Sequence, residues 1–288
     1  MKPPTLPLLA ALFIATQVLA QTDSKRSFDE LITEARGALA GGDAERALSL
    51  STSAVESSPD NPLGYALRAA AHDARREFES SVADYSNLLS LAPDNVAALH
   101  RRGEANFRLG RFKESVADFD KEVSLDPSRE PHHWQRGLSL YYAGEYARGA
   151  KQFELHRTVN PDDVENAAWH YLCVAREKGV VEARRGLIPI EGGADARVPM
   201  KEIHSLYAGK ATADDVLAAT RAGDPPAAEL KRRLMYAHLY VGLHHEAAGA
   251  AGKAKEHITL AAREYAGDDY MSDVARVHLA TFEGREGK

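Results

Sequence analysis

The sequence predicts an all-α fold in which antiparallel helix pairs stack into a solenoid, and three observations lead to this fold class. Alanine, the strongest helix former, is abundant along the chain. Prolines recur at a fixed spacing of 34 residues. They are Pro59, Pro93, Pro127 and Pro161. The position 17 residues before each proline, where a tight turn is expected, is glycine in three of the four periods. The residues at this position are Gly42, Arg76, Gly110 and Gly144. Self-similarity at such a period is typical of stacked repeats, so we expect one helix pair per period.

Two further positions in each period fit two helices joined by that turn. Small residues lie 24 positions before each proline, in the first helix: Ala35, Ala69, Gly103 and Gly137. Larger residues, three of them aromatic, lie 8 positions before it, in the second helix: Ser51, Tyr85, Phe119 and Phe153. We expect the small residues to let the helices approach and the rings to fill the groove between them. Because neither helix buries its apolar face alone, neighbouring pairs should share one core. Proline should end each second helix.

These positions resemble the tetratricopeptide repeat (TPR) family, whose unit is a helix–turn–helix of about 34 residues. The best-matching unit is residues 96–129. We assign four units, at residues 28–61, 62–95, 96–129 and 130–163. The first unit is degenerate, as terminal repeats often are, and an ordinary helical bundle with chance spacing is the alternative. The resemblance implies a right-handed superhelix whose concave surface is formed mainly by the first helix of each pair.

The pattern loosens after Pro161 but continues. Residues 164–230 predict irregular repeat-like helices, and residues 231–288 predict a last TPR-like helix pair followed by a capping helix. We expect helices at residues 164–178, 198–208, 227–248, 251–265 and 270–282. Asp163 and Thr212 are suited to cap the helices that follow them. Residues 187–197 contain proline and glycines and predict a loop.

The N-terminus has the pattern of a targeting segment. Lys2 precedes an apolar run over residues 6–15, and small residues follow up to Ala20. This order is typical of a secretory signal peptide, here residues 1–20 with cleavage near Ala20, followed by a linker at 21–27. We therefore expect a periplasmic or secreted protein with no membrane insertion after cleavage. A retained anchor is the alternative, although the run is short for a membrane span.

A narrower resemblance rests on three C-terminal segments. They are Trp169-His-Tyr-Leu-Cys, the stretch from Ile203 to Leu217, and Ala237-His-Leu-Tyr-Val-Gly. They are similar to segments of NlpI-type bacterial TPR proteins. This resemblance implies a homodimer and an adaptor role in the cell envelope, where murein hydrolases are held and presented to a tail-specific protease. The family is lipid-anchored, but Gln21 occupies the place of the lipid-bearing Cys, and the one Cys of the chain is Cys173.

The expected concave surface supplies the candidate protein-binding residues. They lie on the first helices of the third and fourth units: His100, Glu104, Phe107, Arg108, Trp134, Leu138, Tyr141 and Tyr142. Exposed rigid aromatics beside Arg and Glu suit a binding anchor with a polar rim. For Phe107 and Tyr141, packing between helices is the alternative interpretation. For Trp134 and Tyr142 we favour the groove.

No catalytic, cofactor or metal site is predicted. Adjacent histidines, as at 132–133 and 244–245, point about 100° apart on a helix and make no chelating face. Neither a phosphate-binding glycine loop nor a Gly-x-Ser-x-Gly elbow occurs. Cys173 lies within a predicted apolar helix, which favours a buried, inert thiol. The formal net charge of −6 gives no electrostatic footprint for nucleic acid.

The sequence thus predicts an exported, non-catalytic scaffold or adaptor that binds envelope proteins or peptides in its groove. By resemblance, its partners would include cell-wall hydrolases or a protease. Two alternatives remain open at this point. One is a structural subunit of an envelope secretion or assembly complex. The other is a metal-dependent hydrolase that uses residues 180–230 as a lid.

Overall fold

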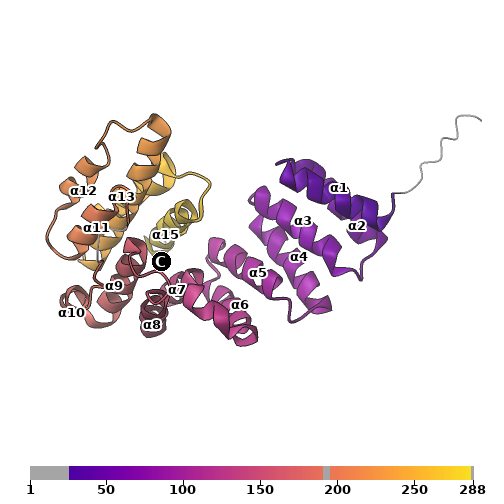
Figure 1. Cartoon of the computed structure of the whole chain (residues 1–288), viewed down its shortest axis with the longest axis horizontal. Coiled ribbons are helices and arrows are strands. Elements are labelled where there is room, and N and C mark those ends of the chain that lie inside the picture. The colour runs from indigo at the N-terminus through magenta and orange to yellow at the C-terminus, as the bar shows by residue number, and fades with distance from the viewer. Residues whose placement is uncertain (1–25, 191–194, 287–288) are drawn as a thin grey trace, which may run out of the picture.

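The computed structural model describes residues 26–190 and 195–286. The predicted signal peptide and most of the predicted linker lie outside these described residues. Within them, all regular structure is helical, and consecutive helices pack against one another along the chain (Figure 1). This confirms the predicted all-α solenoid of helix pairs. In the same ranges, every helix is too short or too polar to span a bilayer.

Six helices form the N-terminal part of the solenoid. Their bounds are α1 (Phe28–Ala40), α2 (Ala44–Ser57), α3 (Pro62–Ala74), α4 (Phe78–Leu91), α5 (Val96–Arg108) and α6 (Phe112–Leu125). The odd-numbered helices begin at the first residues of the first three predicted units. Asn61 and Asn95 each accept a hydrogen bond from a backbone N–H of the helix that follows, so these starts are capped. The predicted repeat period therefore sets the boundaries of these helices.

In the third and fourth units, the close approach of the two helices depends on one glycine in the first helix. A Cβ added to Gly103 would lie 2.6 Å from the ring of Phe119, and one added to Gly137 would lie 2.6 Å from the ring of Phe153. Real Cβ atoms are not found this close to other heavy atoms, so each ring lies directly on the glycine backbone. The prediction that a second-helix aromatic fills the groove beside a small residue is confirmed in both units.

The fourth repeat departs from the predicted pattern at its start. A 3₁₀ turn, η1 (Pro127–His132), precedes α7 (Trp134–Tyr142), and α8 (Tyr146–His156) follows. The helix predicted from residue 130 begins only at Trp134. Pro131 lies inside the turn, and His133 accepts a hydrogen bond from the Arg136 N–H and so caps the shortened helix. Trp134 consequently lies in the first turn of α7.

The C-terminal part contains the remaining helices. They are α9 (Val164–Lys178), α10 (Val180–Arg185), α11 (Met200–Tyr207), α12 (Ala213–Ala219), α13 (Ala227–Ala247), α14 (Ala251–Thr259), the π-helical turn η2 (Leu260–Tyr265) and α15 (Tyr270–Glu286). Asp163 and Thr212 cap α9 and α12 as predicted. The helix predicted from 198 begins at Met200, because Pro199 lies just before it as its cap residue.

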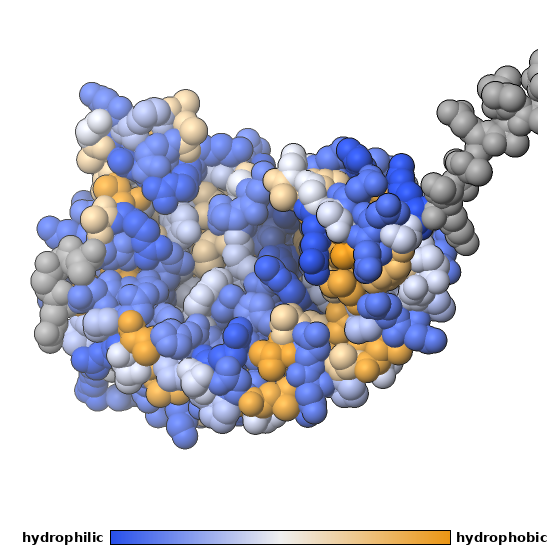
Figure 2. All heavy atoms as spheres, turned by 45° about the vertical axis from the view of Figure 1, so that its right-hand side comes forward, coloured by the Kyte–Doolittle hydropathy of each residue, from blue (hydrophilic) through white to orange (hydrophobic). Residues whose placement is uncertain are grey.

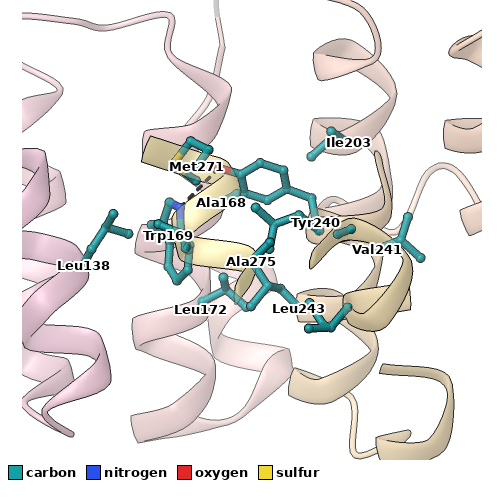
Figure 3. Close-up of a cluster of buried hydrophobic side chains, with 14 of the residues drawn as sticks. Leu138, Ala168, Trp169, Leu172, Ile203, Tyr240, Val241, Leu243, Met271 and Ala275 are labelled. Atoms are coloured by element: carbon teal, nitrogen blue, oxygen red, sulfur yellow. Dashed lines mark hydrogen bonds between the residues drawn. The ribbon is translucent and has the colours of Figure 1, made fainter. Parts of the chain in front are cut away.

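The largest hydrophobic cluster lies in this C-terminal part. It contains residues of every helix from α7 to α15 and Phe107 of α5, and Figure 3 shows Trp169 and Tyr240 within it. The Trp169 Nε1–H donates a hydrogen bond to the Tyr240 hydroxyl at 3.2 Å. Cys173 is fully buried in this cluster, and burial raises the pKa of its thiol, as expected of an inert cysteine. Two smaller clusters hold the N-terminal pairs together.

The outer surface is mostly polar on the face shown in Figure 2, where hydrophobic residues form small groups separated by hydrophilic ones. The last helix, α15, does not lie on this outer surface as a simple end cap. It runs along α13 and back toward α5 and α7, in the middle of the molecule (Figure 1). This placement determines what remains of the concave surface.

Candidate functional site

The concave surface over α5 and α7 is covered by α15. Asp273 of α15 is 3% exposed, and its carboxylate accepts a hydrogen bond from the Arg108 Nε–H at 2.9 Å. The same carboxylate pairs with Arg76 and, at 2.8 Å, with Arg276 of its own helix. Arg76 is the non-glycine residue at the predicted turn position, and its φ of 60° lies in the left-handed region. The chain thus uses this turn to hold a helix that lies far along the sequence.

Aromatic contacts extend this docking. The Tyr270 ring stacks on Phe107 with centroids 5.7 Å apart and meets Trp134 edge-on at 5.0 Å. The Arg108 guanidinium lies over the same Tyr270 ring, 5.0 Å from its centroid. On α7, the Tyr142 hydroxyl hydrogen-bonds to His278 Nδ1 at 2.9 Å. The face of α5 and α7 that we expected to be an open groove is therefore packed against the chain's own helix.

The eight predicted protein-binding residues divide into three groups. Glu104, Phe107, Leu138 and Tyr141 are buried. Phe107 and Tyr141 pack between helices, which is the alternative interpretation left open by the sequence. Arg108 and Tyr142 are partly exposed and contact α15. His100 and Trp134 are also partly exposed and line two separate cavities. Their role in binding a partner stays a prediction.

The larger cavity lies between α7, α8, α9, α13 and the start of α15, with a volume of about 650 Å³. Its apolar walls include Trp134, Leu138, Phe153, Trp169, Tyr236, Tyr270 and Met271. Both tryptophans of the chain are among them. Trp134 is partly exposed at this cavity, while Trp169 is 2% exposed. Cavities of this size with aromatic walls and a few polar groups are typical ligand sites.

Two polar atoms in the cavity wall have no hydrogen-bond partner among the described residues. One is the Asn166 Oδ1, and the other is the Tyr270 hydroxyl. Asn166 is 3% exposed, and its side-chain N–H donates to the Phe153 carbonyl at 3.0 Å, which fixes the direction of the amide. A buried acceptor without a donor costs about 1–3 kcal/mol. A ligand N–H placed against Asn166 would recover this energy.

Carboxylates give the cavity its electrostatic character. Arg197 pairs with Asp163 at 3.1 Å and with Glu165, and Glu165 also accepts a hydrogen bond from the Tyr240 hydroxyl at 3.0 Å. Burial raises the pKa of Glu165 to about 7, although the Arg197 charge acts to lower it. Asp269 adds another carboxylate at the start of α15. Acidic groups outnumber Arg197, so the cavity favours donor-rich or positively charged groups.

The smaller cavity, of about 560 Å³, borders a buried glutamate. Glu122 of α6 has no exposed surface, and its Oε2 lies 3.0 Å from both His100 Nδ1 and His133 Nε2. Its Oε1 accepts a hydrogen bond from the Arg129 Nε–H at 2.6 Å. Burial alone would raise the pKa of Glu122, but hydrogen bonds from His100 and His133 hold it well below its usual range. For His100, burial acts to lower the pKa, but the nearby carboxylates of Glu104 and Glu122 outweigh it and raise the pKa to about 9.

Glu122 and Asn166 were not among the site residues predicted from the sequence. Glu122 occupies the repeat position of Ala54 and Leu88, both of which are buried, so a charged residue in that register was a usable signal. Its partner His133 is the N-cap residue of the next α-helix, α7. A search for metal ligands on one face of a single helix therefore does not find this pair. Asn166 had no comparable signal, because its environment depends on how α15 docks.

The comparisons with known proteins agree with this architecture. The family model described as "Bacterial transcriptional activator domain" matches residues 22–165, which is half of the chain. A solved tetratricopeptide repeat protein from Parabacteroides merdae is 19% identical, with a TM-score of 0.59 over 88% of this chain and 97% of that one. MamA from Desulfovibrio magneticus is 15% identical, with a TM-score of 0.50 over 58% of this chain and 92% of that one.

These likenesses establish the fold, and the predicted resemblance to TPR proteins is confirmed. At such low identity, they carry no statement about partners or activity. The chain has the fold of TPR proteins, and it belongs to the family described as the bacterial transcriptional activator domain.

Proposed function

We propose that this chain is an exported, non-catalytic scaffold that holds a segment of an envelope protein in the cavity between α7, α9 and α15. One observation carries the proposal. A buried acceptor, Asn166 Oδ1, has no donor among the described residues and lies in a cavity walled by Trp134 and Trp169. An extended segment supplies both features that such a cavity lacks, a backbone N–H for the amide and a side chain for the aromatic walls.

The cavity favours a particular kind of side chain. Asp163, Glu165 and Asp269 are among its lining residues, and Trp134 and Tyr236 offer aromatic faces. An Arg or Lys side chain satisfies both, through the carboxylates and through cation–π contact with the rings. We therefore propose a basic residue within the bound segment. The volume of about 650 Å³ accommodates one such side chain with its flanking backbone.

The envelope setting of the proposal rests on sequence features. The N-terminal leader supports export, and the NlpI-like segments support an adaptor for cell-wall hydrolases or for a protease. The family description names transcriptional activators. We do not extend that role to this chain, because its net charge of −6 gives no electrostatic support for binding nucleic acid.

The test uses random peptides displayed on phage and selected on the purified chain. We expect enrichment of peptides that carry Arg or Lys, and at least about a tenfold loss of affinity in Trp134→Ala, as for an aromatic anchor at the centre of an interface. Tyr65→Ala is the matched control, because Tyr65 is a partly exposed aromatic on α3, away from the cavity. Binding that survives Trp134→Ala unchanged would contradict the proposal.

Partner identity comes from capture out of cell-envelope extract followed by mass spectrometry, with Trp134→Ala as the comparison. If the chain is an adaptor, the wild type should capture partners in variable amounts, and Trp134→Ala should not capture them. A complex of fixed stoichiometry that survives the variant would favour the structural-subunit alternative. Tyr142 is a poor choice for substitution in this experiment, because it holds α15 through His278.

A further inference from the structure

We propose that His100, Glu122 and His133 form a binding site for one divalent transition-metal ion, with Zn²⁺ as the probe. The three residues come from the end of the first turn of α5, from α6 and from the cap of α7, so the fold brings together groups that are distant in sequence. Their potential ligand atoms all lie within 4.8 Å of one another. The site borders the smaller cavity and not the larger cavity proposed to bind a partner segment, so it does not depend on the proposed function.

The spacing of these atoms fits a tetrahedral ion. Bonds of about 2.0–2.1 Å to zinc place neighbouring ligand atoms about 3.3 Å apart. The Glu122 Oε2 lies 3.0 Å from His100 Nδ1 and 3.0 Å from His133 Nε2. Shifts of a few tenths of an ångström in these side chains would open the space that the ion needs. In the ion-free protein, imidazole N–H groups bridge these distances, and the metal takes the place of those protons.

The donor set selects the class of ion. Two imidazole nitrogens with one carboxylate oxygen suit Zn²⁺ and its transition-metal neighbours, whereas Ca²⁺ and Mg²⁺ require oxygen ligands. Three protein ligands leave a coordination position on the side of the cavity of about 560 Å³, where Asp126, Ser128 and Gln135 form the wall. Solvent and ions reach the site from there, because His100 is partly exposed.

Outer groups hold two of the ligands in place. The Glu104 Oε1 lies 3.6 Å from His100 Nε2, on the side of the ring away from Glu122, which is the usual arrangement of a carboxylate that orients a metal-binding histidine. Arg129 binds the Glu122 Oε1 at 2.6 Å and leaves Oε2 free to face the ion. His133 gives up one interaction on binding, the long 3.3 Å hydrogen bond that its Nδ1 accepts from the Arg136 N–H.

The first experiment titrates the purified wild-type chain with Zn²⁺ at pH 7.5 by calorimetry, in competition with a chromophoric chelator. We expect one ion per chain, with affinity reduced at least tenfold in His100→Asn and in His133→Asn. His257→Asn is the matched control, because His257 and His238 form another close imidazole pair, with their Nδ1 atoms 2.9 Å apart. Its affinity should equal that of the wild type. Equal affinity in all variants, or loss only in His257→Asn, would overturn the proposal.

A second measurement needs no variant and so does not depend on whether one folds. Nitrogen-15 spectra of wild-type histidine side chains are recorded with and without one equivalent of Zn²⁺. We expect large shifts of His100 Nδ1 and His133 Nε2 and unchanged signals of His257. Unchanged His100 and His133 signals at saturating Zn²⁺ would overturn the proposal, whatever the titration shows.

Discussion

The N-terminal repeats and the C-terminal part of this molecule are built from the same kind of helix but are held together differently. In α1–α6, each helix packs mainly on its neighbours along the chain, around small clusters. In the C-terminal part, one large hydrophobic cluster extends over all helices from α7 to α15, and α15 turns back onto α5, with Asp273 pairing with Arg108, 165 residues away. A periodic sequence therefore encodes local pairing, whereas the shape of the concave surface depends on long-range contacts.

The largest loss of stability is expected at the centre of the C-terminal cluster. Trp169→Ala removes a ring that is 2% exposed, contacts Tyr141 and Tyr240, and donates a hydrogen bond. We expect a loss of about 3–5 kcal/mol in the free energy of unfolding, measured by urea denaturation followed by circular dichroism. A loss below about 1 kcal/mol would show that this cluster does not hold the C-terminal part together.

The docking of α15 gives the next largest effect. Asp273→Asn keeps the side-chain shape but removes the charge that pairs with Arg76 and Arg108. We expect a loss of about 2–4 kcal/mol in the free energy of unfolding, somewhat less than for a fully buried pair because Arg76 is exposed. Amide exchange over residues 270–282 should become faster. Asp268→Asn, at an exposed neighbouring position, should leave both quantities unchanged.

The repeat geometry predicts opposite effects of one substitution at two glycines. Gly103→Ala places a methyl group against the Phe119 ring and should cost about 1–3 kcal/mol. Gly37→Ala, in an exposed helix position with no atom near the added carbon, should stabilise the protein by about 0.4–1 kcal/mol. Thermal unfolding of the two variants measures both. Equal shifts in Tm would contradict the predicted packing of Phe119 on Gly103.

A dependence of stability on pH at the cavity gives a further test. Burial raises the pKa of Glu165 from its ordinary 4.5 to about 7, so the folded state binds more protons than the unfolded state between these values. The unfolding free energy of the wild type should therefore fall from pH 4.5 to 7, relative to Glu165→Gln, and run parallel to it above pH 7. Parallel curves over the whole range would show that Glu165 titrates normally.

The sequence predicted the repeated helices well because each unit repeats the same local physics. The small residue, the tight turn, the aromatic and the terminating proline lie within one period, so the spacing alone was enough to pair Gly103 with Phe119. The fourth unit shows the limit of such reasoning. Pro131 at the expected first turn delays α7 until Trp134, and a proline near a helix start does not show from sequence alone whether it begins or delays the helix.

The candidate site was less predictable, because it depends on where α15 lies. Arg108 and Tyr142 were expected at an open groove, and the structure places them against Asp273 and His278. Aligning the units shows that Arg76 replaces glycine at a turn position. The alignment does not show that Arg76 pairs with Asp273 of α15. Trp134 and Leu138 are the predicted residues that line the cavity we now propose as the binding site.

We expect a partner segment to bind in the cavity while α15 continues to cover the rest of the groove. Hydrogen–deuterium exchange of the chain, with and without a phage-selected peptide, tests both parts in one measurement. Exchange should become slower at the starts of α7 and α9 and around residues 269–271, while the rest of α15 stays unchanged. Protection confined to α1–α4, or faster exchange along all of α15 when the peptide binds, would contradict it.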